Sequence, residues 1–228
     1  MDLTKIINAR TPYEAFGPSW RDLIKEAVIY THPDKNPSPE ARICFERVME
    51  FKNQMSGLEF NDDTSKFKFD WEKTIIQTGP KSLIDASIYW YNEFKLIPEL
   101  FRYIPEDMIR ISETELKILL KRRSVPLNQC LPIELNHVKW ILNRLFEFSA
   151  LGLVKGQLIH AGLTLNSVMI TPEDHGIQLI SFYHSGKAGS KLRSIDASVY
   201  KANILPPTIF SNKKFDDVID CELIKYIT

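Results

Sequence analysis

Cysteine is scarce in this sequence, and its three cysteines form no paired motif. Cys44, Cys130 and Cys221 lie far apart along the chain, with no CxxC spacing among them. Structural zinc sites and disulfide frameworks both need several cysteines at short, recurring spacings. We therefore predict no metal site, and we expect the three thiols to be reduced and mostly packed.

The sequence also lacks an excess of charge of either sign. Lysine and arginine together number 29, and aspartate and glutamate together number 29. A balanced chain has no overall field that would attract phosphate backbones or anionic lipid. This balance argues against a nucleic acid as the partner.

No long hydrophobic run is present. The longest apolar runs, such as residues 27–30, span only a few residues, whereas a helix needs about 20 apolar residues to cross a bilayer. The first residues contain neither a basic region followed by an apolar core nor a small-residue cleavage site, which a secretory signal requires. We expect no membrane-spanning segment and a cytoplasmic protein, located in the host cytoplasm if the source is viral.

The length and composition suit two domains of unequal size. A chain of 228 residues with 44% hydrophobic residues can form a small domain joined to a medium-sized one. Residues 56–68 are rich in glycine, asparagine, aspartate, serine and threonine, which favours a linker. We predict one domain over residues 1–60 and another over residues 66–228.

Two amphipathic helices are predicted near the amino terminus, over residues 18–31 and 39–55. Pro33 disfavours helical backbone in the residue before it and so ends the first helix. Ser38 can cap the second helix, with Pro39 at its first position. The apolar residues that recur at helical spacing are Trp20, Leu23, Ile24, Ala27 and Thr31 in the first helix and Ala41, Phe45, Val48, Phe51 and Met55 in the second.

The motifs of this segment resemble the J-domain family over roughly the first 57 residues. That family opens with a Tyr-Glu-x-x-Gly element, joins two helices through a His-Pro-Asp loop, and carries an A-x-x-x-F pattern on the second of these helices. The corresponding residues here are Tyr13-Glu14 with Gly17, then His32-Pro33-Asp34 followed by Lys35-Asn36-Pro37, then Ala41 with Phe45.

This resemblance implies a DnaK-type chaperone as the partner, with stimulation of its ATPase. The implied chaperone-binding residues are His32, Pro33, Asp34, Lys25 and Lys35. Asp34 would accept a contact from a partner arginine, and His32 would hold the loop or the partner surface. Residues 1–60 carry eight basic and nine acidic side chains, which weakens electrostatic steering. The alternative is that the tripeptide is only a rigid turn between helices.

Several elements are predicted in the second part of the chain. Residues 133–155 carry an apolar stripe at helical spacing and are predicted to be a helix. Two short β-prone runs, 168–170 and 177–180, predict a hairpin. We also predict a hairpin over residues 73–91 that turns at Gly79-Pro80, and a strand or a short helix over residues 115–121.

The segment from Ile133 to Ser181 resembles the middle of a protein-kinase C-lobe. The resemblance rests on a long helix, an H-x-x-L loop that begins at His160, and the two following strands. In kinases this frame carries a catalytic aspartate, a metal-binding asparagine and the aspartate of the DFG element. Laying the frame on this sequence puts Gly162, Ser167 and Ser181 at those three positions and leaves His160 to brace the loop.

All three chemical groups of the frame are therefore absent from the sequence. No glycine-rich phosphate loop and no VAIK-type lysine occurs before Leu131. The last residues correspond to the middle of a kinase C-lobe, so a truncated frame is expected. We predict no catalytic residues and no cofactor.

A short basic run, Lys121-Arg122-Arg123, has two interpretations. It can contact a phosphate, or it can form an ordinary solvated face, which is the more frequent role of such runs. The histidines at positions 160, 175 and 184 have no HxH or HxxxH spacing, which argues against a metal site among them.

The sequence as a whole predicts an α+β protein, mostly helical, with a J-domain-like hairpin followed by a degenerate, truncated kinase-like domain. This pairing resembles two-part proteins of bacteria and large bacteriophages. The predicted function is that of a co-chaperone or adaptor that engages a DnaK-type chaperone and binds an unknown protein client. The alternatives are a divergent phosphotransferase or nucleotide-binding protein, and a structural or inhibitory protein that has lost the chaperone interaction.

Overall fold

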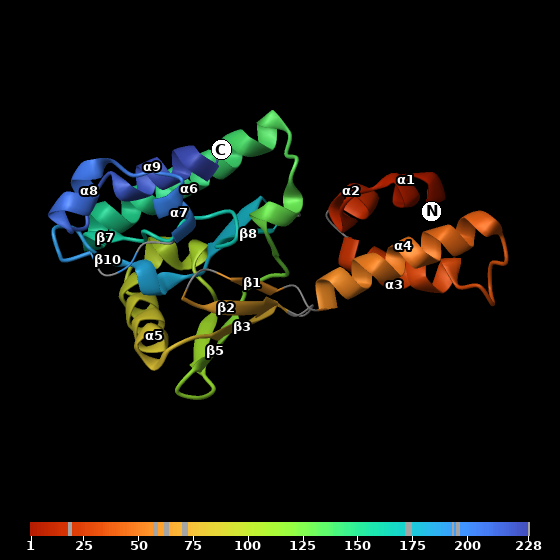
Figure 1. Ribbon diagram of the computed structural model, residues 1–228, viewed down its shortest axis with the longest axis horizontal. Helices are drawn as coiled ribbons and strands as arrows, with labels where there is room; N and C mark the ends of the chain where they lie inside the picture. Colours follow the sequence, from red (N-terminus) through yellow and green to blue (C-terminus); the bar gives the residue numbers. More distant parts are fainter. Residues whose placement is uncertain are drawn as a thin grey trace. The chain divides into compact units, whose positions relative to one another are not determined.

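Figure 1 shows the computed structural model of the protein, which describes residues 1–17, 20–56, 59–61, 64–69, 73–171, 175–192, 194 and 197–227. The chain is mixed α and β, with about half of it helical. Its contacts divide it into two compact units. The amino-terminal unit comprises Met1–Leu58 with Phe69–Glu72, and the large unit comprises Glu59–Lys68 with Lys73–Thr228.

The amino-terminal unit is helical over its described residues 1–17 and 20–56. Its elements are α1 (Leu3–Asn8), α2 (Pro12–Phe16), α3 (Trp20–Thr31) and α4 (Pro39–Ser56). Helices α3 and α4 lie side by side as a hairpin, with α1 against α4 and α2 against α3. The two predicted helices are therefore confirmed, except that residues 18 and 19 lie outside the described part of the chain.

The core of this unit lies where the predicted apolar stripes meet. The fully buried side chains of the hairpin are Trp20, Ile24, Ala27 and Thr31 of α3 and Ala41, Cys44, Val48 and Phe51 of α4. The Met55 side chain, predicted to be part of this face, lies outside the described residues. Burial of this much apolar surface is the main force that holds two short helices together.

Local polar groups fix the ends of the hairpin. The Ser38 hydroxyl accepts a hydrogen bond of 3.1 Å from the Ala41 amide, which confirms Ser38 as the cap of α4. The Thr31 hydroxyl donates to the Ala27 carbonyl at 2.6 Å and so satisfies its own buried oxygen within the last turn of α3. At the other end of the unit, the Arg47 guanidinium donates twice to the Ala9 carbonyl and ties α4 to the end of α1.

The large unit begins with a five-stranded sheet in the order β1–β2–β3–β5–β4. The strands are β1 (Glu59–Asn61), β2 (Lys66–Phe69), β3 (Thr74–Thr78), β4 (Asp107–Arg110) and β5 (Glu115–Leu119). The linker predicted over residues 56–68 is therefore wrong, because β1 and β2 form an antiparallel pair there. Phe60 and Phe67 face each other across this pair with stacked rings, and their burial outweighs the polar composition around them.

The predicted hairpin over residues 73–91 is also wrong. Strand β3 is followed after Pro80 by a helix, α5 (Lys81–Lys95), rather than by a second strand. The side chains that α5 buries recur at helical spacing and are Ile84, Ser87, Trp90, Tyr91 and Phe94. The aromatic residues of this segment favour strands by propensity, but burial of one helical face decides its structure.

The predictions for the remaining part of the large unit are confirmed. The long helix is α6 (Leu135–Gly156), and the hairpin is β8 (Val168–Thr171) with β9 (Gly176–Leu179). The turn residues 172–174 of this hairpin lie outside the described chain. Of residues 115–121, predicted to be a strand or a short helix, Glu115–Leu119 form the strand β5.

Shorter elements complete the large unit. Short stretches of 3-10 helix in the described chain include η2 (Pro98–Tyr103), η3 (Leu127–Cys130) and η5 (Phe182–His184). The short strand β6 (Val125–Pro126) pairs with β8, and β7 (Leu158–Ile159) pairs with β10 (Gly186–Lys187). The last helices are α7 (Ala197–Lys201), α8 (Pro207–Asn212) and α9 (Ile219–Ile227), of which α9 packs on α6. Within the described chain, no helix combines the length and the apolar character needed to span a membrane.

Candidate functional site

The loop between α3 and α4 is held in one shape by its own backbone. The His32 carbonyl accepts hydrogen bonds from the amides of Lys35 and Asn36, each at 2.9 Å. The Asn36 side chain accepts from the Ser38 amide at 3.4 Å. These bonds close a tight turn that carries the chain from the end of α3 into the cap of α4.

His32 braces this loop against α4. Its ring packs edge-on against the Phe45 ring, with the centroids 5.4 Å apart. Its Nδ1 accepts a hydrogen bond of 3.3 Å from the Asp34 amide. The histidine thus orients the residue that follows the proline, and the helix pattern that includes Phe45 supplies the surface on which the ring rests.

Asp34 lies at the tip with its carboxylate in solvent. Its side chain is 88% exposed, and its Oδ2 lies 3.6 Å from the Nδ1 of His32. Pro33, Lys35 and Lys25 are exposed as well. The five residues predicted to bind a chaperone therefore offer accessible surface on the amino-terminal unit.

In the large unit, Gly162, Ser167 and Ser181 lie next to one another, in the loop after β7 and at the end of β9. The Ser167 hydroxyl donates to the Gly162 carbonyl at 2.5 Å and accepts from the Thr164 amide at 2.8 Å. A Cβ atom added to Gly162 would lie 2.9 Å from the Ser181 carbonyl oxygen. An aspartate at position 162 therefore has no room unless the backbone moves.

His160 lies at the centre of a buried aromatic cluster. Its ring centroid is 5.0 Å from that of Phe182, 5.8 Å from Phe148 and 6.1 Å from Phe94. Its Nδ1 accepts a hydrogen bond of 3.2 Å from the Gly162 amide. Burial, with the nearby His184, lowers the pKa of His160 to about 3, so the ring is neutral at physiological pH.

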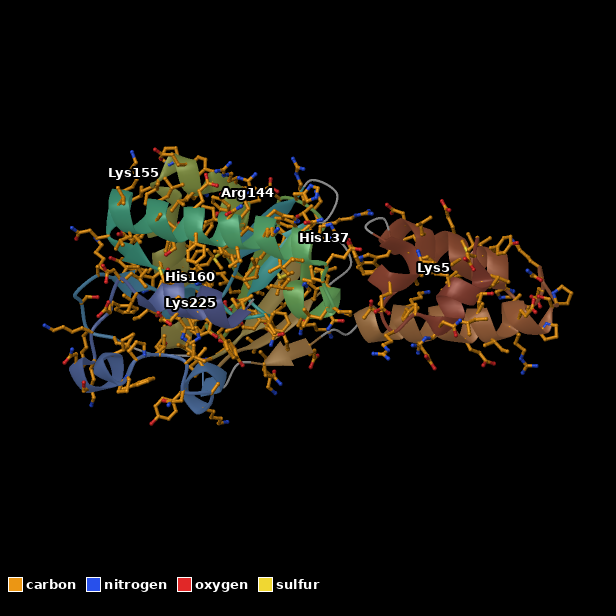
Figure 2. The ribbon with its side chains drawn as sticks, turned by 90° about the horizontal axis from the view of Figure 1, so that it is seen from above. Lys5, His137, Arg144, Lys155, His160 and Lys225 are labelled. Carbon is orange, nitrogen blue, oxygen red and sulfur yellow. The ribbon has the colours of Figure 1, made fainter. Side chains whose placement is uncertain are left out.

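Asp220 of α9, 60 residues further along the chain, anchors the same loop. Its carboxylate accepts hydrogen bonds from the amides of His160 and Ala161, at 2.9 and 2.7 Å. Burial raises the pKa of Asp220 to about 6, and the two amide hydrogen bonds act against this rise. The sequence analysis missed this residue, because no local pattern connects positions 160 and 220. Figure 2 labels His160 beneath α6 and Lys225 on α9 nearby.

Replacing His160 with Phe should make the protein less sensitive to acid. The His160 pKa is lower in the folded state than in the unfolded chain, where it is about 6.5, so the unfolded chain binds the proton more readily and wild-type stability falls as the pH falls below 6.5. Between pH 7 and pH 5 this effect amounts to about 2 kcal/mol. Phenylalanine keeps the ring and lacks the proton site.

The measurement is urea unfolding of both proteins at pH 7 and pH 5. The stability advantage of the wild type over the variant should shrink by about 2 kcal/mol on acidification. An unchanged difference would mean that His160 is not held neutral by its surroundings.

A neutral polar pair bridges β3 and α5. Gln77 is fully buried on β3, and its carbonyl oxygen accepts a hydrogen bond of 3.2 Å from the Ser87 hydroxyl of α5. Its amide nitrogen donates to the Ser65 hydroxyl, also at 3.2 Å. In kinases a lysine of the third strand pairs with a glutamate of the following helix. Here a neutral side-chain hydrogen bond joins β3 and α5, and the sequence analysis missed it because it predicted residues 73–91 to be a hairpin.

Groups suited to a metal ion do not gather in the described chain. Among its residues, no three or more histidine, cysteine or carboxylate side chains come together as metal ligands. His175 lies apart from His160 and packs edge-on against Trp140, with ring centroids 5.2 Å apart. The hydrogen bonds around His160 and Gly162 organise the loop after β7.

The comparisons with known proteins agree with this architecture. No protein-family model and no curated protein matches the sequence. Among solved structures, the kinase PK-1 of the Cydia pomonella granulovirus matches with a TM-score of 0.52 and 11% sequence identity. The match covers 80% of this chain and 72% of the viral kinase. At this level of identity the likeness concerns the fold alone: the chain has a kinase-like fold.

Proposed function

We propose that this protein is an adaptor that recruits a DnaK-type chaperone through the loop of His32, Pro33 and Asp34, and that its kinase-like unit binds a protein client. The observation that carries the proposal is the exposed Asp34 carboxylate on a loop that is already held in shape. In this proposal the protein acts in a cytoplasm, and the kinase-like unit transfers no phosphate.

The physics of the loop supports a binding role. A loop that is ordered before binding loses little conformational entropy when it meets its partner. An exposed carboxylate can accept two parallel hydrogen bonds from an arginine, which gives both strength and orientation. Lys35 follows Asp34 in the loop and Lys25 lies on α3, and both are exposed positive charges that suit an acidic rim on the partner.

Apolar side chains next to the loop support the same role. Ile29 and Tyr30, in the last turns of α3, are 57% and 51% exposed. Exposed apolar residues beside a preorganised polar contact are typical of the centre of a protein interface. The surface beside the tip thus combines the charged side chains of Glu26 and Lys35 with the apolar side chains of Ile29 and Tyr30.

The site residues of the large unit support a binding role without phosphoryl transfer. Phosphoryl transfer depends on positioned magnesium ions and on groups that stabilise charge. The resemblance of the sequence to the frame assigns Gly162, Ser167 and Ser181 to the positions of two carboxylates and an asparagine, and the Ser87 hydroxyl of α5 donates to the neutral Gln77 side chain of β3. A kinase-like fold without these groups keeps a large surface on which a client can bind.

The proposal is tested by measuring single-turnover ATP hydrolysis of a DnaK-type chaperone with and without the full-length protein. We expect the protein to raise the rate. Absence of stimulation with several DnaK-type partners at low salt would leave the tripeptide as a structural turn. That result would favour the structural or inhibitory alternative.

Magnesium and ATP together should not stabilise the protein through the kinase frame. A ligand that binds only the folded state raises the melting temperature in proportion to RT ln(1 + [L]/Kd), and the frame lacks carboxylates that would hold the metal. The measurement is thermal unfolding with millimolar ATP, with magnesium in one series and EDTA in the other. A clear rise in the melting temperature with ATP that occurs with magnesium and not with EDTA would favour the phosphotransferase or nucleotide-binding alternative.

A further inference from the structure

Strand β4 lies at the end of the strand order of the five-stranded sheet, so among the described residues only β5 pairs with it. Met108 and Arg110 face α5, since Met108 is buried and the Arg110 guanidinium pairs with Asp85 of that helix. Ile109 and the following Ile111 lie on the other face and are 44% and 52% exposed. The edge of the sheet therefore carries two exposed isoleucines.

The pairing with β5 decides which backbone groups of β4 point outward. The Ile111 amide donates to the Glu115 carbonyl at 3.0 Å, and hydrogen-bonded pairs alternate along antiparallel strands. Met108 and Arg110 lie between the bonded positions, so their backbone groups point away from β5. The Met108 amide agrees with this, because its partner is the Asp107 carboxylate at 2.9 Å. Among the described residues, the amide and the carbonyl of Arg110 have no hydrogen-bond partner.

The devices that usually protect a sheet edge are weak on β4. Natural edges are kept from pairing by lysine, proline, bulges or very short strands. The one basic side chain of β4, Arg110, is held by Asp85 on the other face, and Asp107 covers a single amide. The opposite edge strand, β1, is three residues long and exposes the polar residues Glu59 and Asn61. Of the two edges, β4 is therefore the one suited to pairing with another strand.

The open part of the β4 edge is complementary to itself. When two copies pair antiparallel about Arg110, the amide of each Arg110 meets the carbonyl of the other. Ile109 of each copy then lies opposite Ile111 of the other, at positions without hydrogen bonds, where side chains come closest. An interface of this kind uses the same surface on both copies, so it closes at two subunits.

Electrostatics allow two copies to approach in this way. The chain carries 29 basic and 29 acidic side chains, so two copies do not repel each other through net charge. The two Arg110 side chains would lie opposite each other, which is unfavourable for like charges. Each of them keeps the Asp85 carboxylate of its own copy, which offsets this repulsion.

We propose that the β4 edge is the interface of a homodimer, in which two copies pair antiparallel about Arg110 and join their sheets into one. An extended segment of another protein could use the same backbone groups, but nothing in it would need to match Ile109 and Ile111 in this register. The proposal makes no use of the loop of His32, Pro33 and Asp34. The dimer and the proposed function therefore stand or fail on separate measurements.

The first test is analytical ultracentrifugation of the full-length protein. Because the interface is small, we expect a dimer with a dissociation constant on the order of 100 µM, measured up to about 500 µM protein. Arg110→Pro removes the outward amide and keeps the bonds to β5, and it should raise this constant by at least about 10-fold. The matched control is Arg110→Ala, which loses the same guanidinium, keeps the amide and should still dimerise. A wild type that stays monomeric at the highest concentration, or equal association of the two variants, would overturn the proposal.

Cysteine cross-linking tests the register and does not depend on the proline variant. In the proposed register Ile109 of one copy lies opposite Ile111 of the other, at a separation that a disulfide can span. An equimolar mixture of the Ile109→Cys and Ile111→Cys proteins should form a covalent dimer under mild oxidation, several-fold more than either variant alone. The wild type, with its own three cysteines, gives the background. Equal yields in the mixture and in the single variants, or yields at background in all of them, would rule out this interface.

Discussion

Asp34→Asn should abolish the stimulation of a DnaK-type ATPase while leaving the amino-terminal unit folded. The amide keeps the shape of the side chain and removes the charge that an arginine of the partner would contact. Losing one member of a charge-assisted contact at an interface costs about 2–5 kcal/mol, a factor of at least about 30 in affinity. The fold is spared because the Asp34 side chain is 88% exposed.

The matched control for this variant is Glu46→Gln on α4. Glu46 is 66% exposed and pairs with Arg42 at 3.7 Å, a surface contact that contributes little to stability. Both variants lose one negative charge, so a general charge effect would appear in both. Equal loss of stimulation in the two, with circular dichroism unchanged, would contradict a specific role for Asp34.

The dependence of ATPase stimulation on ionic strength tests the same interaction in a second way. Residues 1–60 carry eight basic and nine acidic side chains, so long-range steering toward an acidic partner is weak. We expect stimulation weaker than that by a basic J-domain, with little dependence on salt. A steep loss of stimulation with salt would mean that Lys25 and Lys35 contribute more than the overall charge of the segment suggests.

The amino-terminal helices could be predicted because their signals are local. Helix α3 ends at Thr31, two residues before Pro33, and α4 begins at Pro39, directly after its cap Ser38. The end of α3 and the start of α4 are therefore both determined by residues next to them in the sequence. The apolar stripes then identify the faces that meet, and most of their residues are buried; Leu23 and Phe45 are only half-buried, and Cys44, which the predicted stripe did not include, is buried. Helix hairpins of this kind depend on few contacts between distant parts of the chain.

The sheet of the large unit could not be predicted in the same way. Strand β3 pairs with β5 across the intervening α5, and β1 and β2 are very short. Short strands carry too few residues for alternation to be distinguished from a polar loop. The segment after Pro80 contains aromatic residues that favour strands in isolation, and its helical burial becomes evident only once the sheet is present.

The residues of the candidate site also differ in how local their sequence signals are. Gly162, Ser167 and Ser181, which lie close together, could be singled out from the sequence because they belong to one continuous segment. The Gln77–Ser87 pair and the Asp220 anchor could not be identified from the sequence, because each joins residues that lie far apart along the chain. A buried polar side chain within an apolar stripe, as Ser87 is on α5, is the signal that could have indicated the first pair.

Asp220→Ala should cause a large loss of stability in the large unit. The Asp220 carboxylate is buried and accepts from the amides of His160 and Ala161, so its removal leaves two buried donors without a partner. Each such donor costs about 1–3 kcal/mol. Relief of the carboxylate's own burial, which raises its pKa to about 6, offsets part of this. We expect a net loss of about 3 kcal/mol and a decrease of about 6–12 °C in melting temperature.

The measurement is thermal unfolding at pH 7, with Asp217→Ala as the control because Asp217 is exposed in the segment that leads into α9. The control should change stability by less than about 0.5 kcal/mol. Asp220→Asn, which keeps one acceptor oxygen, should fall between the alanine variant and the wild type. If Asp220→Ala unfolds at the same temperature as Asp217→Ala, then the loop of His160 is held by its aromatic contacts with Phe94, Phe148 and Phe182, and the carboxylate is dispensable.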